Sequence, residues 1–291
     1  MPKKKSKVVL AAVPAVPLAL ALVYSALIPG SAKPTGAVTK GPVQCEEPIE
    51  DFRACHSEYP SGCSAKGTDY DFYLNLLKNQ TKWASSQVVT VRDSLDQYKQ
   101  LESQVPDQLG KRNHQDFAEP LAKAGEGKLN GVVGYLYGAK AEGKESSNCQ
   151  LDPGDNNENV DFHIWIGFDE GIAAKLRNKQ KLTATEKKSV KQEAVIVEMT
   201  PQTREILHAD EWTLDALKAA LGRQVRVVGQ LMVDNEHNVA SQNCGRSDAT
   251  DLCWRASVWE LHPVTEFQVC KKGEGCGKSN SADWEDLGGG P

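Results

Sequence analysis

The chain has 291 residues, of which 40% are hydrophobic and 25% charged, and its formal net charge is −5 at pH 7. These fractions are typical of a folded globular protein and exclude a wholly disordered or an all-membrane chain. The acidic balance argues against a protein that binds by covering a phosphate backbone with basic side chains, so nucleic acid is not an expected partner. At about 150 residues per domain, the length indicates one or two domains.

The amino terminus predicts export. Residues 1–30 begin with four lysines and continue with an uncharged apolar run from Val8 to Ile28. Such a run is long enough to cross a bilayer as a helix of about 20 residues, with the lysines on the cytoplasmic side. The expected arrangement is a single-pass anchor in the cell envelope with an extracytoplasmic C-terminal domain. The alternative is a signal peptide cut near Ala32, which would give a secreted protein. Residues 31–44 have the composition of a linker.

Eight cysteines follow the apolar run, and an even number in an exported chain predicts disulfide bonds. Two close pairs bracket short segments near the C-terminus, Cys244 with Cys253 and Cys270 with Cys276. A third pair, Cys55 and Cys63, brackets a short segment near the start, and Cys45 and Cys149 are left over. A zinc–thiolate site is the alternative, but no Cys-x-x-Cys pair supports it.

The segment 45–126 is predicted to be a small, mainly helical, disulfide-containing region. One helix is expected at 69–78, with Asp69 as its cap and apolar residues at helical spacing. A second helix is expected to begin on Thr90. One of its sides is formed, at steps of four and three, by Val91, Leu95, Tyr98 and Leu101. Because apolar residues are few here, the region is expected to pack on the domain that follows.

Residues 127–270 have the pattern of a β domain. Strands are expected at 129–140, 160–167, 194–199, 224–234 and 256–267, a helix at 213–221, and a charged helical connection at 169–191. Three strands, a helix and two strands is the order of an OB-type barrel. The predicted fold class is therefore mainly β (α+β), a five-stranded OB-like barrel with a capping helix. The alternative is a small open sheet with a helix packed on it. The polar, glycine-rich residues 271–291 are predicted to form a flexible tail.

Several short motifs carry a resemblance. They are Gly134-Tyr135-Leu136, Asn148-Cys149, the run from Asp161 to Trp165, and the run from Trp259 to Val264. Together they resemble a group of uncharacterised bacterial exported proteins with OB-like sequences, over about residues 45–269. The most specific part is the Glu-x-His-Pro-Val signature at the last strand. The resemblance implies the fold and the export, and it implies no activity.

Three histidine–carboxylate pairs are the candidate ligand or metal site: Asp161 with His163, Asp234 with His237, and Glu260 with His262. In a strand, residues two apart share a face, so the first and last pairs should each point one way. Such pairs could bind a divalent metal with one side chain left as a general base, which would suit a hydrolase. They could also bind a ligand, or simply orient one another. The two strand histidines alternate with apolar residues, so both are expected outside the barrel core or at its rim; the alternative is that they are buried in a hydrogen-bonded network.

Trp165 is a candidate stacking residue, because OB barrels often present aromatic side chains to ligands. The alternative is that it covers a second small core against the helical region. No nucleophile elbow, phosphate loop or dinucleotide fingerprint occurs, so catalytic residues stay unassigned. No cofactor is predicted beyond a possible divalent metal. The leading hypothesis is a binding or interaction module for a saccharide, peptide or protein, and the alternative is a metal-dependent hydrolase.

Overall fold

The computed structural model describes residues 52, 69–80, 89–145, 148–208 and 210–289. The predicted membrane segment, the linker and three of the eight cysteines lie outside these residues. Within the described part of the chain, every helix is too short or too polar to cross a bilayer.

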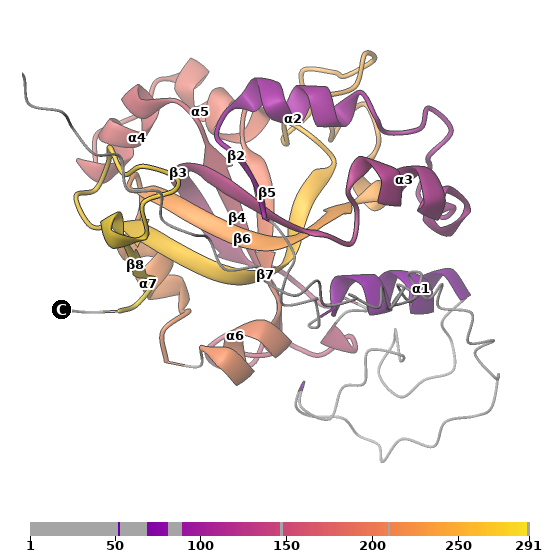
Figure 1. Cartoon of the computed structure of the whole chain (residues 1–291), viewed down its shortest axis with the longest axis horizontal. Helices are drawn as coiled ribbons and strands as arrows, with labels where there is room; N and C mark the ends of the chain where they lie inside the picture. Colours follow the sequence, from indigo (N-terminus) through magenta and orange to yellow (C-terminus); the bar gives the residue numbers. More distant parts are fainter. Residues whose placement is uncertain (1–51, 53–68, 81–88, 146–147, 209, 290–291) are drawn as a thin grey trace, which may run out of the picture. The chain divides into compact units, whose positions relative to one another are not determined.

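Five strands form a closed barrel. They are β3 (Leu129–Ala141), β4 (Phe162–Gly167), β5 (Val195–Met199), β6 (Gln224–Val233) and β7 (Trp259–Cys270). The strand order is β3-β4-β5-β7-β6, and β6 pairs back onto β3 to close the ring (Figure 1). The β5–β7 pair is parallel and the other four are antiparallel. The sequence prediction of a mainly β barrel is confirmed, and the strand order fits the OB-type arrangement. The open sheet is ruled out.

Closure depends on the long strand β3, which pairs with β6 along its first half and with β4 along its second. At the changeover the two backbones approach so closely that a Cβ on Gly134 would lie 2.6 Å from the carbonyl oxygen of Gly167. Gly167 in turn lies against the ring of Tyr137, which leaves no space for a side chain. The glycines in β3 therefore permit the sharp bend that a small barrel needs.

The strands are apolar on the face that points into the barrel. Val195, Val197 and Met199 alternate along β5 and belong to the main core, together with Ile164 and Ile166 of β4. The side chains between them, such as Glu198, point to the outer face of the barrel because successive residues of a strand point to opposite sides. That outer face carries the predicted site.

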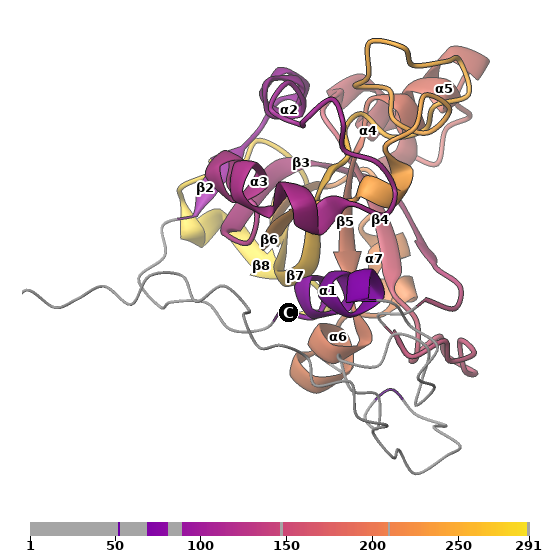
Figure 2. The ribbon, with the colours of Figure 1, turned by 90° about the vertical axis from the view of Figure 1, so that its right-hand side faces the viewer.

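Helices fill the connections. The charged connection between β4 and β5 contains α4 (Glu170–Arg177) and α5 (Ala184–Gln192), as predicted. Between β5 and β6 lie α6 (Pro201–Leu207) and α7 (Leu214–Ala219), and the Thr213 hydroxyl caps α7 as expected. Before the barrel come α1 (Asp69–Lys78), α2 (Leu95–Glu102) and, after a 3-10 turn, α3 (Ala118–Ala124). Figure 2 shows α2 and α3 on one side of the barrel and α1 lying near β7.

The predicted start of the second helix at Thr90 is wrong. Residues Thr90–Arg92 form a short strand, β2, which pairs in parallel with the start of β3. The helix α2 begins only at Leu95, after Ser94. The apolar spacing from Leu95 onward is helical, but the β-branched pair before it extends the sheet, and Arg92 donates to the Asn130 side chain at 2.6 Å.

The helical region is held to the barrel by a buried carboxylate. Glu102, at the end of α2, accepts hydrogen bonds from the Ser257 hydroxyl at 2.6 Å and the Val258 amide at 3.0 Å. It also accepts from the Asn243 side chain at 2.5 Å. The indole of Trp259 donates to the Leu101 carbonyl at 3.0 Å. The expectation that this region packs on the following domain is therefore met for α2.

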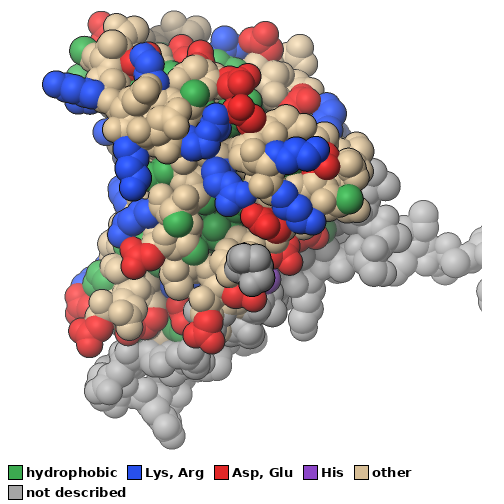
Figure 3. All heavy atoms as spheres, turned by 90° about the vertical axis from the view of Figure 1, so that its left-hand side faces the viewer, with side chains coloured by type: hydrophobic (Ala, Val, Ile, Leu, Met, Phe, Trp, Pro, Cys, Tyr) green, Lys and Arg blue, Asp and Glu red, His purple; other side chains and the backbone are tan. Residues whose placement is uncertain are grey.

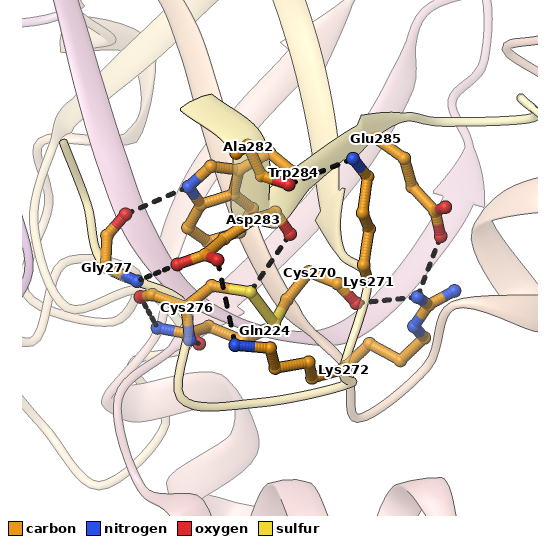
Figure 4. Close-up of a disulfide and its surroundings, with 11 residues drawn as sticks. Gln224, Cys270, Lys271, Lys272, Cys276, Gly277, Ala282, Asp283, Trp284 and Glu285 are labelled. Atoms are coloured by element: carbon orange, nitrogen blue, oxygen red, sulfur yellow. Dashed lines mark hydrogen bonds and ion pairs between the residues drawn. A yellow bond between two sulfur atoms is a disulfide. The ribbon is translucent and has the colours of Figure 1, made fainter. Parts of the chain in front are cut away.

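The C-terminal segment is not the predicted flexible tail. It returns to the barrel as β8 (Trp284–Asp286), which pairs with the end of β7 (Figure 4). The disulfide Cys270–Cys276 closes the turn between them, and the Gln224 side chain accepts from the Cys276 amide at 2.8 Å. The buried Trp284 indole donates to the Gly277 carbonyl at 3.1 Å. The polar, glycine-rich composition indicated a tail, but Trp284 and the Cys270–Cys276 disulfide anchor the segment to the barrel.

We expect Trp284→Ala to lower the free energy of unfolding by roughly 3–5 kcal/mol, because it removes a buried indole from a packed site. Leu252→Ala is the control, since Leu252 is 76% exposed and its loss should cost less than about 0.5 kcal/mol. Denaturant unfolding measures both variants. A Trp284→Ala protein as stable as the control would restore the flexible-tail interpretation.

Candidate functional site

The predicted histidine–carboxylate residues gather into one network on the outer face of the barrel. Asp161, His163, Asp234, Glu260 and His262 are all at most 4% exposed. The sixth residue, His237, stays partly exposed and pairs with Asp234. The two strand histidines do point away from the core. The expectation that they lie at an open rim is wrong, however, because other elements cover this face.

Arg255 joins two of the predicted pairs. Its Nη1 donates to Asp234 Oδ2 at 2.8 Å and to Glu260 Oε2 at 3.3 Å, and the guanidinium is completely buried. Asp234 follows β6 and Glu260 belongs to β7, which are neighbouring strands. The two pairs therefore meet, as the adjacency of these strands suggested, but through an arginine that the prediction did not include.

Asp161, Glu198 and His262 form the tightest group. Asp161 directly precedes β4, Glu198 lies on β5 and His262 on β7. His262 Nε2 is 3.4 Å from Asp161 Oδ2, and His262 Nδ1 is 3.2 Å from Glu198 Oε2. One ligand atom from each of the three residues lies within 4.8 Å of the others. This group is the one set among the described residues that could hold a metal ion.

The predicted pairing of Asp161 with His163 is not observed. His163 Nδ1 instead faces Glu142 at 2.8 Å and Glu198 at 3.4 Å, while Asp161 faces His262. Asp161 lies one residue before the strand begins, so the two-residue repeat that relates side chains within a strand does not extend to it. In contrast, Glu260 and His262 lie within β7 and do share a face, with 3.2 Å between Oε1 and Nδ1.

An aromatic ring covers part of the network. Trp254 contacts the rings of His163, at 5.6 Å between centroids, and of His237, at 5.1 Å. Trp254 and Arg255 directly follow Cys253, whose disulfide with Cys244 closes the preceding loop. The Cys244 amide donates to the Arg255 carbonyl at 2.8 Å. This predicted disulfide therefore positions the segment that carries both the covering tryptophan and the central arginine.

The helix α1 covers the network from the side of β6. Gln230 on β6 donates to the Leu77 carbonyl at 2.7 Å and to the His262 carbonyl at 2.9 Å. Leu74 packs against Met232 on the same face. Lys78, at the end of α1, pairs with Glu145 at 3.3 Å. Helix α1 thus covers the outer face of the strands that carry the site.

The charges of the network shift the pKa values of its members. Burial opposes the charge on His262, but Glu198, Asp161 and Glu260 outweigh it and raise its pKa to about 10. Burial and the charge of Glu260 raise the pKa of Glu198 well above its ordinary range. Burial also disfavours the charged form of Asp234, yet Arg255 and His237 hold its pKa well below its usual value. The carboxylates around His262 therefore favour its charged form, and Arg255 favours the charged form of Asp234.

Trp165 does not present an open stacking face. It is partly buried in a second apolar cluster with Tyr137, Ile172 and Ala194, and its ring lies 4.7 Å from that of His163. The alternative of a second small core is therefore the one observed. Its partners differ from those expected, because the cluster draws on β3, α4 and the residue that precedes β5, and on none of the described residues between 45 and 126.

A polar groove of about 250 Å³ lies between the end of α2 and the disulfide loop. None of the described residues that line it is aromatic. The lining residues are Lys99, Glu102, Ser103, Val105, Pro106, Asp107, Asn238, Gly245, Arg246, Ser247 and Asp248. The sequence prediction missed this surface, since its residues come from two segments more than 100 positions apart and form no motif.

Comparison with protein-family models, with curated proteins and with solved structures found no match to this chain. The resemblance carried by the short motifs therefore stays a prediction.

Arg255 and Glu198 are the main site residues that the sequence prediction missed. Glu198 carried a usable signal, because it is the one charged residue in the otherwise apolar strand Val195–Met199. A charge within a strand that is buried on both faces must find a partner. Arg255 lies between strands in a polar loop, where a charged residue is ordinary, so nothing marked it.

Arg255→Met should lower the free energy of unfolding by roughly 3–5 kcal/mol, because it leaves Asp234 and Glu260 buried without their cation. Lys188→Met is the matched control. It breaks the Lys188–Asp251 pair at 2.9 Å, whose side chains are 49% and 96% exposed, and should cost less than about 1 kcal/mol. Denaturant titrations give both values. Equal stability of the two variants would show that the network does not depend on the arginine.

Proposed function

We propose that this chain is a non-enzymatic binding module of the OB-fold class that acts outside the cytoplasm and binds a peptide or a protein segment. The observation that carries the proposal is the groove between α2 and the disulfide loop, which is open while the histidine network is covered. In this proposal the network holds the covering elements in place, and the groove does the binding.

The chemistry of the groove favours a peptide over a saccharide. Basic side chains (Lys99, Arg246) and acidic ones (Asp107, Asp248) line it together with backbone at Gly245. Saccharides and bases are commonly held by stacking on aromatic rings, and the described lining residues include none. A charged peptide can pair with both signs of charge and with exposed backbone groups.

A hydrolase is the alternative, and burial speaks against it. His262 and Asp161 are completely buried, and Glu198 is 4% exposed. A hydrolytic site needs a concave opening in which substrate reaches the reactive groups. None of the six predicted residues lines the groove described above. The arrangement suits a buried support better than a reaction centre.

Nucleic acid remains an unfavoured partner. Figure 3 shows lysine and arginine side chains gathered across the face next to α4 and β8, with carboxylates among them. Arg223 pairs with Glu285 at 3.0 Å and Arg177 with Glu274 at 2.5 Å. A basic side chain already paired with a carboxylate is a poor phosphate ligand, since binding would have to displace its partner.

The proposed compartment rests on the cysteines. The disulfides Cys244–Cys253 and Cys270–Cys276 are formed, and Cys149 is also disulfide-bonded. Such bonds persist in oxidising compartments outside the cytoplasm. With the lysine-led apolar run at residues 1–30, they support an envelope protein anchored in the membrane, or a secreted one if that segment is removed.

Peptides selected from a displayed library on the full chain in detergent should bind at least about tenfold more weakly to Lys99→Glu than to the wild type, a difference of about 1.4 kcal/mol. Lys123→Glu is the matched control. Both lysines are exposed, lie near a helix end and pair with an acid one turn earlier, but Lys123 lies outside the groove. Peptides that bind all three proteins equally would count against the groove.

An activity screen separates the binding module from the hydrolase alternative. If the chain is a binding module, chromogenic ester, phosphate, glycoside and peptide substrates, assayed with added zinc or manganese, should give the same background rates for the wild type and His262→Gln. A turnover that is present in the wild type and lost in folded His262→Gln would replace the proposed binding function with catalysis.

A further inference from the structure

The buried group of Asp161, Glu198 and His262 has the donor set of a metal site. Two carboxylates and one imidazole suit zinc or manganese, which accept oxygen and nitrogen ligands. The ligand atoms lie within 4.8 Å of one another. They come from three adjacent elements, since β5 pairs with both β4 and β7.

The spacing of the group matches metal ligands better than a hydrogen bond. His262 Nε2 and Asp161 Oδ2 are 3.4 Å apart, beyond the range of about 2.7–3.2 Å that N–H···O hydrogen bonds prefer. Two ligands of a tetrahedral zinc ion, each about 2.1 Å from the metal, lie about 3.4 Å apart. The separation of His262 and Asp161 therefore fits two ligands of a shared cation.

Two polar atoms of the group also lack hydrogen bonds. Glu198 Oε2 and His262 Nε2 are buried, and neither makes a hydrogen bond to any group among the described residues. Their residues are 4% and 0% exposed. Both atoms lie at ion-pair distance from other members of the group without hydrogen-bond geometry. Buried polar atoms of native proteins are rarely left unsatisfied, so both atoms are free to accept a ligand.

The surroundings of His262 have the form of a metal outer shell. Its Nδ1 lies 3.2 Å from Glu260 Oε1, and Glu260 is held by Arg255. A histidine that binds a metal usually donates its other ring N–H to a carboxylate, which fixes the tautomer and the orientation of the ring. In this arrangement Nδ1 donates to Glu260 and Nε2 faces Asp161 as the ligand atom.

We propose that Asp161, Glu198 and His262 bind one divalent zinc or manganese ion, which cross-links β4, β5 and β7 on the outer face of the barrel. The ion has a structural role, since the site is covered by α1 and by Trp254. The proposal is independent of the groove and of the proposed peptide binding.

Metal content of the full chain tests the proposal. Protein expressed with added zinc and manganese and purified without chelator should hold close to one equivalent by mass spectrometry of the element. Removing the ion with a chelator should lower the melting temperature by at least about 5 °C, and adding the same metal back should restore it. A wild type that stays empty after exposure to both metals would overturn the proposal.

Variants assign the ion to this site. His262→Gln and Glu198→Gln should each lose the bound metal, and Glu198→Gln keeps the shape of the side chain if the histidine variant fails to fold. His114→Gln is the matched control, because His114 is equally buried and faces Glu126 at 2.9 Å but belongs to no three-ligand group. Its metal content should equal that of the wild type. Metal retained in folded His262→Gln would place the ion elsewhere and contradict the proposal.

Discussion

The structure depends on the compensation of carboxylates buried on the outer face of the barrel. Four acidic side chains, Asp161, Glu198, Asp234 and Glu260, are withdrawn from water there. An isolated ionised carboxylate is far too costly to bury, so each must be paired, protonated or bound to a metal. Arg255 satisfies two of them directly. The other two face His262, whose Nε2 lies 3.4 Å from Asp161 and whose Nδ1 lies 3.2 Å from Glu198.

The same face explains how the segments outside the barrel are held. Polar groups do much of the positioning. Gln230 bridges α1 and β7, while Glu102 joins α2 to the backbone near Val258. Such bonds specify one position more strictly than apolar packing does, because a shifted partner would leave a buried polar group unsatisfied. The barrel is therefore a platform on which helices and loops are placed by a small number of buried polar groups.

The positions of the five barrel strands along the chain were predictable from their apolar residues. The glycines of β3 indicated its bend. His163 and His262 were predicted to lie outside the barrel core or at its rim, and both point away from the core. Their burial was not predictable, since the two-residue repeat tells which face a side chain takes and not what covers that face. Glu198 and Arg255 lacked a local motif, and the anchoring of Trp284 depends on contacts that composition does not report.

The polar links between the first helices and the last strands have a kinetic consequence. The bond from Gln230 to Leu77 spans 153 residues, and that from Ser257 to Glu102 spans 155. Contacts of such long sequence separation slow folding, because the chain loses conformational entropy before the contacts form and stabilise it. During synthesis, α1 cannot form its bond to Gln230, nor α2 its bond to Ser257, until those distant residues have been made. A ribosome-bound fragment that ends before Gln230 therefore lacks the β6 residue that packs on Leu74 and the Ser257 hydroxyl that donates to Glu102, and such incomplete chains are prone to aggregate.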